Sequence, residues 1–280
     1  MRKVIDSNWL QSPELRSYLS KSKQNIAILT DYAAMEAYQG NTLIGIYKSM
    51  EIVADYPDQI LILKSTALVC GLSGRSTSLQ KRLIDDKQSK DFRIFIRNLR
   101  LAKHGNQTVQ RQLLKYSNYA SEHLNKMLED AKTTGAAFDD LTTSYSKDEK
   151  KLIRNQGIYT YEMIDKIVKA VLKVVGDVLK DHPNVQNFPT YEELPNTFIF
   201  RATLCTYLLA LNWGATGGAK DVRTKKLRND MIDMNFVAYA TYFDGILSED
   251  AKVNLIYREA CLFLSALFAC QISGKIYKTK

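Results

Sequence analysis

The sequence is poor in the residues that build disulfide frameworks and zinc sites. Its 280 residues include only four cysteines and three histidines. The cysteines form no Cys-x-x-Cys pair, and no histidine lies at a spacing typical of a zinc site. A disulfide-stapled scaffold and a zinc-binding module are therefore excluded, and reduced core thiols of a cytoplasmic protein are expected. The four cysteines are Cys70, Cys205, Cys261 and Cys270.

Long uninterrupted apolar segments, repeats and low-complexity tracts are also missing. The two most apolar tracts are residues 197–215, which Arg201 interrupts, and residues 260–272, which are too few to span a bilayer. Both tracts are expected to be buried helices. No apolar run follows Met1, so no secretory signal is expected. These absences favour a cytoplasmic protein and disfavour a membrane partner.

Positive charge, in contrast, is in excess. The formal net charge is +9, and 45% of the residues are hydrophobic, enough for the core of one large domain or two closely packed ones. An anionic partner is expected. Nucleic acid is favoured because no basic amphipathic stretch has the bulky apolar face of a helix that lies on a membrane. Charge that serves only solubility is the alternative.

Strand and helix patterns alternate at the start of the chain and then give way to helices. Apolar runs at residues 3–6, 25–30 and 59–64 predict strands, and the patterns at residues 13–21 and 31–54 predict the helices between them. This alternation is typical of βαβ units in a parallel sheet. Residues 71–221 predict a mostly helical insertion, and residues 1–70 and 222–280 predict the α/β core. The helices expected in the insertion cover residues 78–102, 108–132, 147–182 and 195–213.

Acidic residues occur where the first and last predicted strands end. Asp6 follows the first strand, and Asp250 follows the apolar run Gly245-Ile246-Leu247. Carboxyl ends of parallel strands share one edge of the sheet, where ligands bind. Glu36 lies on an early predicted helix and Asp233 on a late one, so four acids from distant parts of the chain are candidates for one metal-binding pocket.

The order of these motifs resembles that of the PIN-domain nucleases. The resemblance covers roughly residues 1–70 and 222–270. It implies an α/β/α fold with a central parallel sheet, here enlarged by the helical insertion. The motifs are Val4-Ile5-Asp6-Ser7-Asn8, Glu36 within Ala33-Ala34-Met35-Glu36-Ala37, Asp230-Met231-Ile232-Asp233, and Ile246-Leu247-Ser248-Glu249-Asp250.

The resemblance also implies roles for these residues. Four catalytic acids, Asp6, Glu36, Asp233 and Asp250, are expected to hold Mg²⁺ or Mn²⁺, ions that prefer carboxylate oxygens. Asn8, Ser248 and Asp230 are expected to orient them or the water around them. Asp230 competes with Asp233 for one ligand position, at the predicted start of a helix.

Ordinary structural roles are the alternative for each acid. Asp6 suits an Asx-turn, Glu36 a solvated helix face, and Asp230 or Asp233 a helix N-terminus. Asp250 suits the cap of the following helix. The proximity of the four carboxylates in space decides between these roles and a shared metal site.

Two groups of basic residues are candidates for phosphate contacts. Arg223, Lys225, Lys226 and Arg228 directly precede the acidic helix and are the preferred nucleic-acid-binding set. A second group, Arg93, Arg97 and Arg100, recurs at helical spacing and is better explained as a solvated helix face.

The sequence thus predicts a metal-dependent endonuclease that acts on single-stranded or loop RNA, with DNA as the second substrate. Analogy suggests a toxin or a defence effector, and the insertion offers a surface for a regulatory protein. A non-catalytic RNA-binding or scaffold protein on the same fold is one alternative. A helical protein-interaction module is the other.

Overall fold

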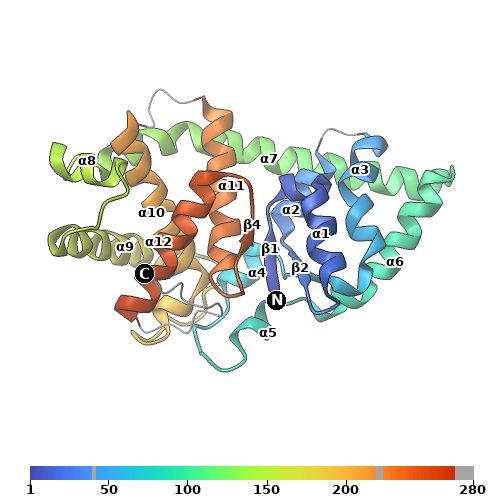
Figure 1. Cartoon of the computed structure of the whole chain (residues 1–280), viewed down its shortest axis with the longest axis horizontal. Coiled ribbons are helices and arrows are strands. Elements are labelled where there is room, and N and C mark those ends of the chain that lie inside the picture. The colour runs from blue at the N-terminus through green and yellow to red at the C-terminus, as the bar shows by residue number, and fades with distance from the viewer. Residues whose placement is uncertain (40–41, 219–222, 269–280) are drawn as a thin grey trace.

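The computed structural model describes residues 1–39, 42–218 and 223–268, with the side chains of residues 130–137 and 139 left aside. The protein is mostly helical and contains a small parallel sheet (Figure 1). The strands are β1 (Arg2–Ile5), β2 (Ile26–Leu29), β3 (Ile60–Ile62) and β4 (Ile246–Leu247). The helices are η1 (Ser7–Gln11), α1 (Pro13–Lys21), α2 (Asp31–Tyr38), α3 (Leu43–Asp55), η2 (Pro57–Gln59), α4 (Thr66–Cys70), α5 (Leu79–Leu83), α6 (Asp86–Lys103), α7 (Gln107–Leu141), α8 (Lys147–Arg154), α9 (Tyr161–Asp181), η3 (Leu194–Asn196), α10 (Phe198–Thr216), α11 (Thr224–Ala240) and α12 (Ala251–Phe268).

The sheet has the strand order β3-β2-β1-β4, and every pair is parallel. Val4 is opposite Ile28 on one side and Ile246 on the other, so the first and last strands of the chain are neighbours. The parallel α/β architecture expected from the alternating patterns is confirmed. All four strand ends that precede the helices therefore lie along one edge.

Helices cover both faces of the sheet, because successive side chains of a strand point to opposite sides. Val4 and Ile28 join a core made largely by α9, α10, α11 and α12. Ile5, Ala27 and Leu29 join a second core made largely by α1, α3 and α6. The predicted strands are apolar throughout because both of their faces are buried.

Helices α8, α9 and α10 share the first of these cores with the sheet, α6 belongs to the second, and α7 contributes residues to both. Helix α10 is buried almost all round and packs against α11 and α12 as well as α7, α8 and α9. Its one charged residue, Arg201, donates to the carbonyls of Pro195 and Thr241, and its guanidinium lies 3.8 Å from the ring centroid of Tyr242. These contacts explain how a charge is accommodated in such an apolar helix. No described helix combines the length and apolarity needed to cross a membrane.

Three predicted helices are each divided in two. Residues 78–102 form α5 and α6, and Asp85 caps α6 by accepting a hydrogen bond from the Gln88 amide at 2.8 Å. Residues 31–54 form α2 and α3, and Thr42 caps α3 by accepting a hydrogen bond from the Gly45 amide at 3.2 Å. Residues 147–182 form α8 and α9, separated by a turn in which Gln156 has a φ of 54°. In all three cases local cap and turn chemistry overrides the continuous helical pattern.

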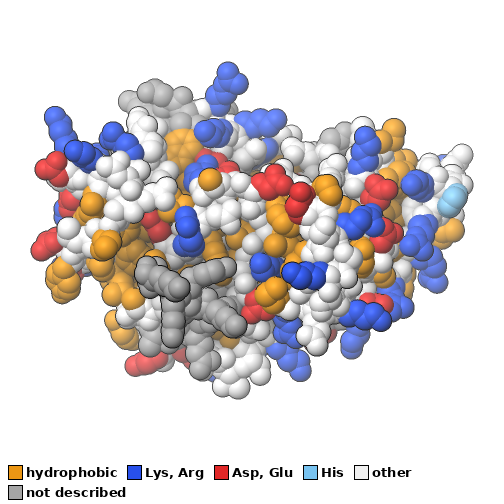
Figure 2. Space-filling view, viewed as in Figure 1, with side chains coloured by type: hydrophobic (Ala, Val, Ile, Leu, Met, Phe, Trp, Pro, Cys, Tyr) orange, Lys and Arg blue, Asp and Glu red, His pale blue; other side chains and the backbone are white. Residues whose placement is uncertain are grey.

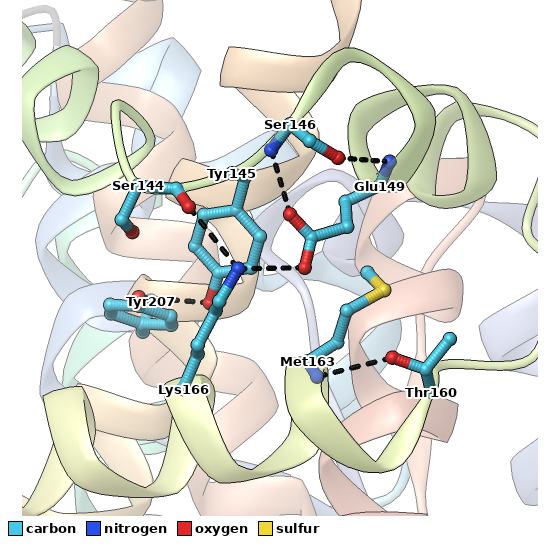
Figure 3. Close-up of polar contacts among 8 residues, drawn as sticks. All are labelled: Ser144, Tyr145, Ser146, Glu149, Thr160, Met163, Lys166 and Tyr207. Atoms are coloured by element: carbon cyan, nitrogen blue, oxygen red, sulfur yellow. Dashed lines mark hydrogen bonds and ion pairs between the residues drawn. The ribbon is translucent and has the colours of Figure 1, made fainter.

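A polar cluster fixes α8 against α9 (Figure 3). Ser146 and Glu149 form a reciprocal capping box: the Ser146 amide donates to Glu149 at 2.7 Å, and the Glu149 amide donates to Ser146 at 3.2 Å. The Lys166 ammonium donates to Glu149 at 2.8 Å and to the Ser144 carbonyl at 3.2 Å. Beneath it, the hydroxyls of Tyr145 and Tyr207 are 3.1 Å apart, so the turn before α8 is attached to both α9 and α10.

Candidate functional site

Asp6 is a buried carboxylate at the carboxyl end of β1, with 2% of its surface exposed. Its Oδ2 accepts a hydrogen bond from the Ser248 hydroxyl at 2.7 Å. Its Oδ1 accepts from the Asn8 amide at 3.3 Å and from the Ser7 hydroxyl at 3.5 Å. The predicted meeting of Asp6 and Ser248, at opposite ends of the chain, therefore occurs. Asn8 contributes its backbone amide, which also makes Asp6 the cap of η1.

Glu36 lies in the second turn of α2, which begins directly after β2 and is capped by Thr30. Burial raises the pKa of the Glu36 carboxyl, and the negative charge of Asp6 raises it further. The Ser7 hydroxyl and the Arg228 guanidinium oppose this shift. Glu36 is therefore half-buried beside Asp6 rather than on a solvated helix face.

Asp233 projects into the same region from the middle of α11. Burial is the main cause that raises its pKa, to about 8, and the charges of Asp6, Asp230 and Glu36 add to it. Lys252 opposes the shift. Among the described residues, none donates a hydrogen bond to this carboxyl group. Burial and nearby like charges both favour the protonated form of this carboxyl group.

The start of α11 corrects one sequence expectation. The helix begins at Thr224, so Asp230 and Asp233 lie inside it and not at its N-terminus. Asp230 is buried and forms an ion pair with Lys252 of α12, while its Oδ2 has no hydrogen-bond partner among the described residues. Burial raises the pKa of Asp230, and Lys252 opposes this. Asp230 is thus paired with a cation, whereas Asp233 lies among acids.

Asp250 is exposed and caps α12. Its Oδ1 accepts hydrogen bonds from the amides of Lys252 at 2.7 Å and Val253 at 3.3 Å. Its own amide donates to the Ser248 hydroxyl at 3.1 Å, which connects it to Asp6. The alternative role as a helix cap is therefore observed for Asp250, and its role as a metal ligand remains a prediction.

We define the acidic cluster as Asp6, Glu36, Asp230 and Asp233. Its donors are carboxylate oxygens, which suit hard divalent cations such as Mg²⁺ and Mn²⁺. In the described part of the chain, no group of three or more His, Cys, Asp or Glu side chains is arranged to hold a metal ion. The chemistry of the donor set fits such an ion, but side-chain rearrangement is needed to enclose it.

The basic residues at the start of α11 have two different environments. Arg223, Lys225 and Lys226 are exposed, as a phosphate-binding role requires. Arg228 is not: it is 3% exposed, and its guanidinium donates to the Asn229 side chain at 2.7 Å and to the Leu124 carbonyl on α7 at 3.5 Å. Its placement in the nucleic-acid-binding set is therefore corrected, because an interior contact with α7 holds it.

Lys252 and Trp213 are the parts of this region that the sequence did not indicate. The ammonium groups of Lys226 and Lys252 lie 5.4 Å and 5.6 Å from the Trp213 ring centroid, within the range of cation–π attraction. Lys252 thus connects Asp230 to the basic start of α11. Its position two residues after Asp250 carries no motif that would have distinguished it. The face of the molecule seen in Figure 2 carries both acidic and basic side chains.

No family model, no curated protein and no solved structure matches the chain.

Proposed function

We propose that this protein is a metal-dependent nuclease with a PIN-like core and a helical insertion, and that it cleaves single-stranded or loop RNA, with DNA as the second substrate. One observation supports this most. Three carboxyl groups, at the end of β1, on α2 and on α11, lie close enough at the carboxyl edge of a parallel sheet that Asp6 raises the pKa of Glu36, and both of them raise that of Asp233. Such an edge is the usual ligand site of open α/β sheets.

The excess negative charge is the reason for proposing a cation. Asp6, Glu36 and Asp233 would hold Mg²⁺ or Mn²⁺. When bound, the ion would polarise a water molecule and neutralise charge on the scissile phosphate. Ser248 would keep Asp6 oriented, since its hydroxyl already donates to that carboxylate at 2.7 Å. Asp233 would give up its proton on binding, because a coordinating carboxylate must be deprotonated.

Positive charges beside the cluster suit a phosphate group. Lys252 is only partly exposed and lies next to Asp230 and Asp233, where its ammonium could stabilise the phosphoryl oxygens. Arg223, Lys225 and Lys226 are exposed at the start of the helix that bears the acids, so they would attract the backbone of a nucleic acid. The acids that would bind the cation are thus adjacent to the basic residues that would bind the nucleic-acid backbone.

The two alternative functions lead to different expectations for the basic residues and for the acidic cluster. A non-catalytic RNA-binding or scaffold protein would use the basic residues without cleavage. A helical interaction module would have no use for the acidic cluster, and the convergence of Asp6, Glu36 and Asp233 disfavours it. Carboxyl groups placed beside one another in a partly buried site lower stability through their mutual repulsion, and perturbed carboxyl groups of this kind are typical of functional sites.

Cleavage assays with Asp6→Asn test the proposal. Purified protein is incubated with end-labelled single-stranded RNA and DNA in Mn²⁺, Mg²⁺ or EDTA. The native protein should cleave RNA with either ion and lose activity in EDTA. Asp6→Asn should lower the rate by at least ~10²-fold, since even outer-shell partners of metal ligands contribute ~10–100-fold. Asp6→Asn should still melt cooperatively, because the substitution hardly changes the volume of the side chain.

The matched control is Asp148→Asn, which changes an exposed acid on α8 outside the cluster. It should cleave like the native protein. Cleavage that survives in Asp6→Asn at the native rate, in a preparation free of contaminating nuclease, would reject the nuclease assignment.

A further inference from the structure

A cavity opens at the same edge of the sheet, beside the acidic cluster. It has a volume of about 600 Å³ and lies where β2 and β3 end, between α2, α6 and α7. Most of its lining is apolar, including Leu29, Met35, Met50, Ile62 and Phe92. None of the four acids of the cluster lines it.

Helix α2 separates this cavity from the acidic cluster. Met35 and Tyr38 line the cavity, whereas Glu36, between them in sequence, belongs to the cluster. The strand ends give the same relation. Leu29 and Thr30 at the end of β2 line the cavity, and Asp6 ends the adjacent strand β1. Neighbouring strands are about 4.8 Å apart, so the two sites are next to each other along the edge.

Aromatic rings surround the mouth of the cavity. Tyr116 and Tyr119 of α7 are 50% and 54% exposed, and both line it together with Phe95 of α6. Tyr116 also meets Tyr38 edge to face, with ring centroids 6.4 Å apart. Large rings left open to solvent on a concave surface offer faces for stacking, since burying an aromatic ring is favourable.

The polar groups in the lining are few and suit the edge of a heterocycle. Gln88, Asp91 and His123 bring amide, carboxylate and imidazole groups to the cavity. Asp31 has a different role, because both of its oxygens accept hydrogen bonds from Thr66, at 2.6 Å and 2.8 Å. The Lys115 ammonium lies 5.7 Å from the Tyr119 ring centroid and adds positive charge at the rim.

We propose that this cavity binds one unstacked nucleobase of a single-stranded nucleic acid. The base stacks on Tyr119 or Tyr116 and uses its polar edge on the lining amide, carboxylate and imidazole groups. Its phosphate then lies toward α2 and the acidic cluster. This inference rests on the proposed function for the identity of the ligand. It adds a substrate requirement, namely an unpaired base beside the cleaved bond, because a base in a duplex cannot enter a cavity.

Binding to a cleavage-deficient protein tests the inference apart from catalysis. The probe is a fluorescent single-stranded RNA of eight nucleotides, titrated into Asp6→Asn and into Asp6→Asn with Tyr119→Ala or Tyr116→Ala. Removal of a stacking ring should weaken binding roughly tenfold, because base stacking is worth ~1–3 kcal/mol per base. An oligonucleotide with abasic sites should bind weakly to all three proteins and show no difference among them.

The control is Tyr191→Ala, which removes a tyrosine that is 71% exposed and does not line the cavity. It should bind RNA like the parent. Thermal melts check the folding of each variant, and the exposure of both cavity tyrosines makes loss of the fold unexpected. Unchanged RNA affinity in both cavity variants would overturn the inference, whether or not the native protein cleaves RNA. Base-dependent binding without any cleavage would keep the cavity and reject the nuclease.

Discussion

Two charged clusters in this protein each combine carboxyl groups with a lysine, but the pKa of the main carboxyl group shifts in opposite directions. At the turn before α8, Glu149 accepts from the Lys166 ammonium and from the Ser146 amide, and these two contacts lower the pKa of its carboxyl group. In the acidic cluster, burial and the neighbouring carboxylates raise the pKa of Asp233 to about 8. One carboxylate has its charge balanced, and the other does not.

This difference is the reason that we propose a function for the acidic cluster and not for the cluster around Glu149. Buried polar groups in folded proteins are nearly always hydrogen-bonded, so an exception requires an explanation. This chain supplies a lysine, a backbone amide and a capping box around Glu149. It leaves the buried Asp230 Oδ2 without a partner in the described region, and it places the partly buried Asp233 among other carboxylates. A ligand that brings positive charge is the simplest explanation for the second arrangement.

The largest expected effect comes from neutralising the unbalanced acid. In EDTA, Asp233→Asn should be more stable than the native protein at pH 8 and about equally stable near pH 4. The folded-state pKa is raised from 3.8 to about 8, so the native fold holds a proton that the unfolded chain releases in this range. Native stability therefore falls as pH rises through the window and levels off above about pH 8.

Thermal melts from pH 4 to pH 9 measure this directly. The stability gap between Asp233→Asn and the native protein should open with pH and reach a few kcal/mol, at about 1.4 kcal/mol per pKa unit. Asp148→Asn should track the native protein at every pH. If Asp233→Asn is the less stable protein at pH 8, Asp233 is not held among unbalanced charges.

A divalent ion should reduce the contrast between the two clusters by supplying the missing charge. Mn²⁺ should raise the melting temperature of the native protein at pH 7.5, by an amount that increases with ion concentration. Each tenfold excess over the dissociation constant adds about 1.4 kcal/mol. That corresponds to roughly 2–3 °C for a chain of 280 residues.

Asp233→Asn should show a much smaller rise with Mn²⁺, because it lacks one of the carboxylates. Glu149→Gln should show the full rise, since Glu149 lies outside the acidic cluster. A native melt that ignores Mn²⁺ would leave the cluster without a cation and would favour the helical interaction module.

The shared edge formed by the carboxyl ends of parallel strands explains how much of this site could be predicted from the sequence. Short apolar runs followed by polar residues located β1 and β4 to within a residue, and the shared edge of a parallel sheet then brought Asp6 to Ser248. Both steps depend only on local pattern and on topology. The pairing of Asp230 with Lys252 could not be predicted in this way, because it depends on how α11 packs against α12.

The position of Arg228 shows the same limit. In the sequence, Arg228 is one of four basic residues between positions 223 and 228. In the structure, α11 starts at Thr224 and directs Arg228 inward, where the Leu124 carbonyl on α7 accepts a hydrogen bond from it. Helix start and tertiary partner together decide whether a basic residue is available to a phosphate. Neither is encoded in the local charge pattern.

The smallest expected effect is in the balanced cluster. Glu149→Gln should lower the stability by about 1 kcal/mol at neutral pH, the usual worth of a capping interaction together with a partly exposed ion pair. Glutamine can still accept from the Ser146 amide, so the loss reflects mainly the missing charge beside Lys166. Because the carboxyl pKa is lowered in the folded protein, this stability is present at neutral pH and disappears as pH falls through the folded-state pKa. Native and variant melts should thus converge in acid, as they do for Asp233→Asn, but the gap at neutral pH has the opposite sign: Glu149→Gln is less stable than the native protein, whereas Asp233→Asn is more stable. RNA cleavage by Glu149→Gln should remain at the native level. A variant that loses cleavage but keeps its stability would show that the two clusters are not functionally separate.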